Sequence, residues 1–143
     1  FAFFQAGVTP DADVLARCVD LLDGRPELSL VRCGGGAEPD FAALRAGDAT
    51  PGGVVLRREA FTACGGFAPG LMDCLFWDFR LAAAAAGHFG DRLPGEGERA
   101  GTASRVDAGH PEFPEVVRRN RQIFPRETVL ALAKPPQGME ERT

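Results

Sequence analysis

Apolar residues along the chain follow two patterns, short continuous runs and stripes that recur every three or four residues. Short continuous runs are typical of buried strands. Stripes with helical spacing are typical of helices that bury one face. These patterns predict strands at 1–4, 28–33, 53–57 and 88–93, and helices at 9–24, 40–45, 58–64, 76–86, 114–124 and 127–133.

Start and stop residues support two of these helices. Thr9 can cap the first helix, Pro10 suits its first position, and Gly24 stops it. The segment 76–86 ends with five consecutive alanines and is followed by Gly87, so it is the strongest predicted helix. Its small side chains would let it pack close to a sheet.

The alternation of strands and helices predicts an α/β layered domain. We expect a short mixed sheet flanked by helices and followed by a helical C-terminal tail. The run 1–4 resembles a buried parallel strand, and its sheet would expose an edge unless a missing N-terminal half or a second copy of the chain pairs with it. Residues 1–134 are assigned to this domain, and 135–143, which begin with two prolines, are expected to form a disordered tail.

The charge balance argues against one class of partner. The 143 residues include 16 basic and 20 acidic side chains, and nucleic-acid binding needs a basic face, so we expect no nucleic-acid partner. The basic run 118–121 is interpreted as a solvated helix face. No apolar run approaches the roughly 20 residues of a membrane span, which predicts a cytoplasmic protein. Because the chain starts at Phe1 without a methionine, we expect it to be part of a longer protein that could itself associate with a membrane.

The cysteines are scattered rather than clustered. Cys18, Cys33, Cys64 and Cys74 show no C-x-x-C spacing and are accompanied by only two histidines. Zinc sites gather thiolates or imidazoles at short spacing, so we expect no metal at these cysteines. Cys18 and Cys64 fall on apolar helix faces, which favours small core residues in a reducing compartment.

The most informative stretch joins a hydrophobic strand, a glycine pair and the strongest helix. The strand 54–56 runs into Arg57-Arg58-x-x-Phe61, Gly65-Gly66-Phe67 follows, and Trp77-Asp78 stands at the head of the helix. This combination resembles the acceptor-side segment of the family 2 glycosyltransferases, and the resemblance covers residues 1–105. It implies the C-terminal half of a GT-A fold.

The resemblance also implies a donor site with a divalent cation, Mn or Mg, held by an Asp-x-Asp motif after the first strand. Gln5 and Gly7 occupy the positions of those two carboxylates, so we expect no metal cofactor in this chain. Arg99 matches the arginine of a later aromatic-Arg-x-His segment. His110 is interpreted either as a displaced ligand or as an ordinary loop residue.

In the resembling family, a Glu-Asp pair directly before Trp-Asp supplies the base that deprotonates the acceptor hydroxyl. Leu75 and Phe76 occupy the positions of that pair, and neither can accept a proton. Asp73 lies just upstream and Asp78 matches the later aspartate of the motif, so these two are the candidate catalytic carboxylates. Asp78 also fits a structural position at the start of the helix.

Three functional hypotheses remain open at this point. The first is a glycosyltransferase-related domain, degenerate or incomplete, whose parent would use a nucleotide sugar and a glycan acceptor. The second is a non-enzymatic scaffold or a carbohydrate- or protein-binding module of a larger polysaccharide-biosynthesis protein. The third is transfer by another mechanism through Asp73 and Asp78. The aromatic residues Phe76, Trp77 and Phe79 could stack on sugars, but their helical spacing favours a core.

Overall fold

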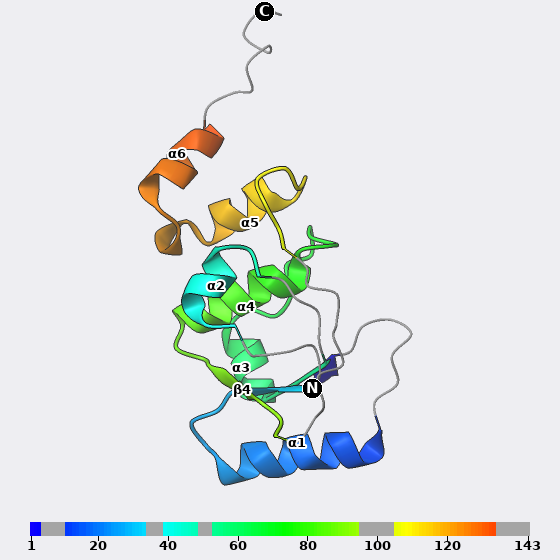
Figure 1. Cartoon of the computed structure of the whole chain (residues 1–143). Coiled ribbons are helices and arrows are strands. Elements are labelled where there is room, and N and C mark those ends of the chain that lie inside the picture. Colours follow the sequence, from blue (N-terminus) through cyan, green and yellow to red (C-terminus); the bar gives the residue numbers. More distant parts are fainter. Residues whose placement is uncertain (4–10, 34–38, 49–52, 95–104, 134–143) are drawn as a thin grey trace, which may run out of the picture.

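A four-stranded mixed sheet forms the centre of the protein (Figure 1). The computed structural model describes residues 1–3, 11–33, 39–48, 53–94 and 105–133. The strands lie in the order β1-β3-β2-β4, with β3 antiparallel to β1 and β2, and with β2 parallel to β4. The expected α/β class with a short mixed sheet is therefore confirmed. The strands are β1 (Ala2–Phe3), β2 (Leu30–Cys33), β3 (Gly53–Leu56) and β4 (Gly90–Arg92).

One row of the sheet crosses all four strands. Phe3 lies opposite Val54, Val54 lies opposite Arg32, and Arg32 lies opposite Arg92. Because β1, β2 and β4 run in the same direction, their carboxyl ends meet at one edge of the sheet. The chain therefore leaves the strands at Phe3, Cys33 and Arg92 on the same side.

The interpretation of residues 1–4 as a buried parallel strand was wrong for its described part. β1 is hydrogen-bonded to the antiparallel strand β3, and Ala2 is exposed while Phe3 is half-buried. An apolar run does not reveal strand direction, because direction depends on a partner distant in the sequence. Among the described strands, β1 and β4 are the outermost strands of the sheet. Pairing between two copies of the chain through an outermost strand stays a prediction.

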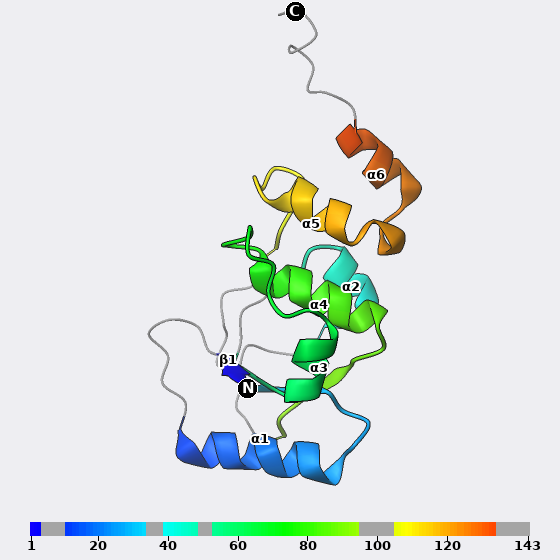
Figure 2. The same ribbon diagram turned by 180° about the vertical axis from the view of Figure 1, so that it is seen from behind.

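Helices cover both faces of the sheet (Figures 1 and 2). On one face lies α1 (Ala12–Gly24), whose Cys18 and Leu22 pack against Val31 and Val55. On the other face lie α3 (Arg58–Ala63) and α4 (Leu75–Ala85). The core on that side consists of buried residues from the sheet and from α4: Leu30, Val54, Leu56, Phe79 and Ala83.

A further layer of helices covers the outer side of α4. It contains α2 (Phe41–Arg45), α5 (Phe113–Arg119), the 3-10 turn η1 (Arg121–Ile123) and α6 (Arg126–Ala133). Trp77 is only 2% exposed, stacks on Phe113 with ring centroids 6.1 Å apart, and donates its indole N–H to the Leu44 carbonyl over 2.8 Å. Since Phe79 is buried against the sheet, α4 is enclosed on both sides and its aromatic residues serve the core.

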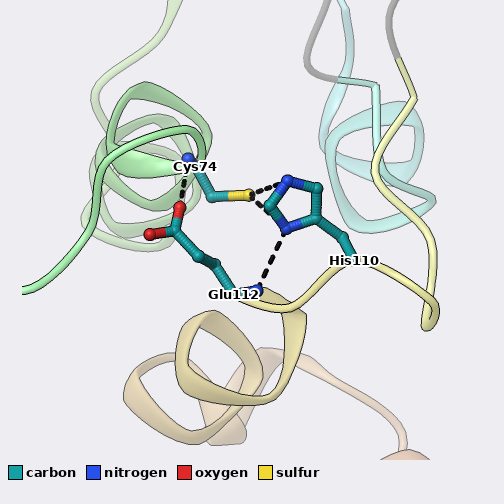
Figure 3. Close-up of side chains that lie close together, drawn as sticks. All are labelled: Cys74, His110 and Glu112. Atoms are coloured by element: carbon teal, nitrogen blue, oxygen red, sulfur yellow. Dashed lines mark hydrogen bonds between the residues drawn. The ribbon is translucent and has the colours of Figure 1, made fainter.

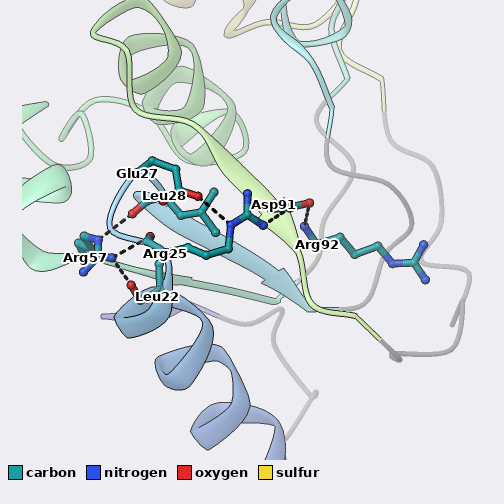
Figure 4. A network of polar contacts seen from close by, with 7 residues as sticks. All are labelled: Leu22, Arg25, Glu27, Leu28, Arg57, Asp91 and Arg92. Atoms are coloured by element: carbon teal, nitrogen blue, oxygen red, sulfur yellow. Dashed lines mark hydrogen bonds and ion pairs between the residues drawn. The ribbon is translucent and has the colours of Figure 1, made fainter.

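Arg57, at the end of β3, ties the sheet to the end of α1 (Figure 4). Its guanidinium donates to the carbonyls of Leu22, Arg25 and Leu28. A cation at a helix C-terminus satisfies orphan carbonyls and favours the helix dipole. Arg25 in turn pairs with Asp91 of β4 over 2.6 Å. Arg57, the first arginine of the Arg57-Arg58 motif, therefore connects the sheet to the end of α1.

Two predicted helices differ from the structure by more than one residue at one end. α1 begins at Ala12 with Asp11 at the N-cap, and Thr9 and Pro10 lie outside the described residues. The helix predicted at 114–124 ends at Arg119 and continues as a 3-10 turn after Asn120. The Asn120 amide donates to the Val116 carbonyl and to Asp78, which fixes the last turn from outside the helix.

Within the described residues, no helix combines the length and the apolar character needed to cross a membrane. The tail expected at 135–143 lies outside the described residues. All four cysteines lie inside them, and none of the four forms a disulfide there.

Candidate functional site

The site that the sequence predicts lies in the loop between α3 and α4 and in the first turn of α4. Gly65 and Gly66 both adopt positive φ, 80° and 68°, which lets the chain reverse after α3. Phe67 then enters an aromatic cluster, with ring centroids 5.0 Å from Phe3 and 5.2 Å from Phe61. The Gly-Gly-Phe motif therefore anchors this loop against the sheet.

A carboxylate from a distant segment holds the end of this loop. Glu112 accepts the backbone N–H groups of Met72, Asp73 and Cys74, each over 2.8 Å. Cys74 is the N-cap of α4, so the carboxylate lies at the positive end of that helix. These hydrogen bonds, that of Met72 foremost, lower the pKa of Glu112.

His110 contacts both the backbone of Glu112 and the thiol of Cys74 (Figure 3). Its Nδ1 accepts the Glu112 backbone N–H over 3.0 Å and lies 3.6 Å from Cys74 Sγ. Burial, followed by the charges of Glu112 and Asp73, raises the pKa of the Cys74 thiol to about 11. Cys74 is therefore a protonated thiol in this environment rather than an activated nucleophile.

Asp78, one of the two candidate carboxylates, is buried in the interior. It is 2% exposed, and its Oδ1 accepts the Asn120 side-chain amide over 2.8 Å and lies 3.2 Å from Arg119 Nε. These contacts join the first turn of α4 to the end of α5. The arrangement gives Asp78 a structural environment between two helices.

Asp73, the other candidate, projects into solvent. Its side chain is 80% exposed, and its Oδ2 lies 3.6 Å from His110 Nε2. The resemblance places the base pair at Leu75 and Phe76, which are both half-buried. Phe76 packs among aromatic rings, 6.2 Å from Phe67 and 6.3 Å from Phe79 between centroids. Asp73 and Asp78 therefore occupy opposite environments and do not meet in one site.

The candidate donor positions lie outside the described residues. Gln5 and Gly7 follow β1, and Arg99 follows β4. The last described residues before them, Phe3 and Pro94, leave β1 and β4 at the edge where the carboxyl ends of the strands meet. In open α/β sheets ligands bind outside this edge.

Two arginines of the interior were not assigned to a site from the sequence. Arg32 of β2 and Arg80 of α4 are 2% and 5% exposed. Burial, and secondly the charge of Arg32, lowers the pKa of Arg80 to about 9. Arg80 also lines a cavity of about 270 Å³ together with His88 and Asp91. The available signal was the position of Arg32 between apolar residues of a predicted strand.

The structure also gives Glu112 and His110 roles that the sequence did not indicate. Glu112 lies 38 residues after Cys74, and a separation of that length in the sequence does not predict that the two residues are in contact. His110 was considered, but only as a displaced ligand or a loop residue. The one local signal is the sequence Pro111-Glu112 before a predicted helix, which marks a capping position.

Comparison with known proteins gives no match: the chain matches no protein-family model, no curated protein sequence and no solved structure significantly. The contacts described above are therefore the basis for functional inference.

Proposed function

We propose that this chain is a glycosyltransferase-related domain of family 2 type that retains the scaffold but lacks transfer chemistry. The scaffold in this proposal is the C-terminal half of a GT-A domain. Its parent would hold a nucleotide sugar and a glycan acceptor, and a divalent cation such as Mn or Mg would neutralise the leaving diphosphate. The proposal starts from the sequence resemblance and is supported by two features of the described residues.

The first supporting feature is the arrangement of the parallel strands. β1, β2 and β4 end at one edge, and this edge is where a phosphate-bearing donor binds in open α/β sheets. The chain continues from Phe3 to Gln5 and Gly7, which replace the two carboxylates expected there. A neutral amide and a glycine give a hard cation much less charge than two carboxylates would.

The observation that carries the proposal is the apolar first turn of α4. Leu75 and Phe76 lie at the positions of the expected acidic pair, and both side chains pack against the core clusters. The nearest carboxylate within α4, Asp78, is held by Asn120 and is buried. A general base contributes about 10²–10⁴-fold to a rate, so its loss alone would reduce transfer severely.

The second candidate is a scaffold or binding module without enzymatic function. The clamp formed by Glu112 on Met72, Asp73 and Cys74 favours it, because the loop on the acceptor side is fixed by three backbone hydrogen bonds. A fixed loop suits a constant binding surface. It does not suit the loop closure by which many transferases enclose their substrates.

Calorimetric titration of the chain with nucleoside diphosphate sugars, with and without Mn²⁺, tests the proposal. Saturable binding of the nucleotide sugar that Mn²⁺ does not strengthen, without release of nucleoside diphosphate, supports the degenerate transferase, because the carboxylates for the cation are replaced. Binding of sugars without a nucleotide, or of proteins, supports the binding module instead.

Sugar transfer by the chain would contradict both candidate functions, and Asp73 would then be the candidate base. The decisive variant is then Asp73→Asn, with Asp20→Asn on the exposed side of α1 as the matched control. Loss of turnover in Asp73→Asn alone would identify Asp73 as the base. Unchanged turnover would remove Asp73 from consideration.

A further inference from the structure

Three metal-ligating side chains from two distant segments meet at the start of α4. Cys74 is the N-cap of that helix, while His110 and Glu112 precede α5 (Figure 3). One ligand atom from each of the three lies within 4.8 Å of the other two. We propose that Cys74, His110 and Glu112 bind a zinc ion. This inference does not depend on the proposed function.

The spacing of sulfur and nitrogen fits a shared ion. Cys74 Sγ lies 3.6 Å from His110 Nδ1. A tetrahedral zinc ion with Zn–S near 2.3 Å and Zn–N near 2.0 Å holds these two ligand atoms about 3.5 Å apart. Cys74 Sγ also lies 4.0 Å from His110 Nε2, so the imidazole must rotate to aim its Nδ1 lone pair at an ion beside the sulfur.

The protonation of the imidazole also suits a metal. Because Nδ1 accepts the Glu112 backbone N–H, Nδ1 carries no proton and presents a lone pair. As the ring rotates, zinc takes this lone pair in place of the N–H. That exchange is tolerated because Glu112 is the N-cap of α5, where the first N–H groups have no partner within the helix.

Glu112 can serve the ion and the loop together. Its Oε1 accepts the N–H groups of Asp73 and Cys74, whereas its Oε2 accepts only that of Met72. A carboxylate oxygen has two acceptor positions, so Oε2 retains one, and a rotation of the carboxylate brings it to the cation, since Oε2 points away from the thiol in Figure 3. A water can then complete the fourth position.

The local charge favours a cation. Glu112 and Asp73 place two carboxylates beside the thiol, and both raise the pKa of Cys74. Their charges oppose a bare thiolate but attract a divalent ion. When the ion binds, the thiol releases its proton to solvent and the thiolate becomes a ligand.

The donor set selects the metal. A thiolate and an imidazole with one carboxylate are ligands that zinc accepts, whereas magnesium and calcium require oxygen ligands. The site therefore differs in kind from the Mn or Mg site of the resembling family. A bound ion would connect the start of α4 to the start of α5 and stabilise both.

The experiment is a titration of the whole reduced chain, freed of metal by a chelator, with Co²⁺ as a spectroscopic substitute for zinc. We expect one equivalent to produce thiolate-to-cobalt charge transfer and tetrahedral d–d absorption, and zinc to displace it. Cys74→Ser should abolish the charge-transfer absorption. His110→Asn should weaken binding more than tenfold, because even changes behind a ligand cost about 10–100-fold.

Cys64→Ser is the matched control, since Cys64 is a half-buried thiol outside the cluster. It should bind Co²⁺ like the unchanged chain. Circular dichroism of each metal-free variant verifies folding, and zinc should raise the melting temperature of the unchanged chain but not of Cys74→Ser. Absence of charge transfer, or its persistence in Cys74→Ser, would overturn the proposal.

Discussion

The Asn120 side-chain amide donates a hydrogen bond to the Asp78 carboxylate over 2.8 Å, in a place where both residues are buried. This contact joins α4 to the end of α5 across 42 positions of sequence. Arg119 adds a partly exposed ion pair to the same oxygen. The aspartate of the Trp-Asp motif is thus explained by packing between helices.

Asp78→Ala should therefore destabilise the fold. The change leaves the buried Asn120 amide without its acceptor and removes the partner of Arg119, which together cost about 2–3 kcal/mol. Chemical denaturation followed by circular dichroism measures the loss. Asp73→Ala, at an exposed position, should stay within about 0.5 kcal/mol of the unchanged chain. Equal effects of the two changes would contradict the structural role of Asp78.

The two motif glycines make a matched pair for a second prediction. Both have positive φ, but a Cβ on Gly65 meets open space whereas a Cβ on Gly66 lies 3.2 Å from the Phe61 ring. Gly65→Ala should cost about 1 kcal/mol from backbone strain alone. Gly66→Ala should cost about 1 kcal/mol more, because the aromatic cluster must shift. Denaturation midpoints of the two variants, compared directly, test this difference.

The core role of Trp77 leads to a third prediction. Trp77→Phe removes the indole N–H that bonds the Leu44 carbonyl and leaves a gap beside Phe113. We expect a loss of about 2–4 kcal/mol, from the unpaired carbonyl and the cavity together. The exposed Met72, changed to alanine, is the control and should have little effect. If Trp77 instead formed a sugar-binding platform, its replacement would change binding and leave stability nearly intact.

The fold could be predicted where the signals are local. α4 begins and ends within one residue of its predicted bounds, because its alanine run and Gly87 act on neighbouring residues. The antiparallel pairing of β1 with β3 and the clamp formed by Glu112 on the loop before α4 could not be predicted. Both depend on contacts between segments far apart in sequence, and neither leaves a periodic pattern. The contact between Cys74 and His110 likewise joins distant segments, so no local pattern predicts it.

The clamp by Glu112 leads to a pH-dependent prediction. Hydrogen bonds to Met72, Cys74 and Asp73 hold the pKa of Glu112 in the folded state below its ordinary value of 4.5. The carboxylate therefore contributes stability above pH 4.5, and this contribution is lost as pH falls through the lowered value. His110, Asp73 and the Cys74 thiol are the other titratable groups that face it, and the thiol, with its pKa raised to about 11, stays neutral over this range. With metal chelated, Glu112→Gln should be less stable at neutral pH and lose less stability on acidification.

The control for this prediction is Glu127→Gln, at an exposed position of α6. It should follow the unchanged chain over the whole acidic range. The comparison is made as the free energy of unfolding between about pH 7 and pH 3. A Glu112→Gln curve parallel to that of the unchanged chain would contradict the lowered pKa.

The last prediction tests separately the two losses that the proposed function combines, the loss of the base and the loss of the carboxylates that hold the cation. Phe76→Asp places a carboxylate at the position of the expected base, in the first turn of α4, at the expense of the Phe76 contacts with Phe67 and Phe79. We expect no release of nucleoside diphosphate from a nucleotide sugar in the presence of Mn²⁺, because Gln5 and Gly7 still offer the cation no carboxylate.

The matched control for this substitution is Phe89→Asp, which changes an exposed phenylalanine between the end of α4 and the start of β4. It adds the same charge to the chain without placing a carboxylate near the expected base position. Circular dichroism verifies that both variants remain folded before nucleoside diphosphate release is measured. Release by Phe76→Asp alone would show that the donor side is intact and that only the base is missing.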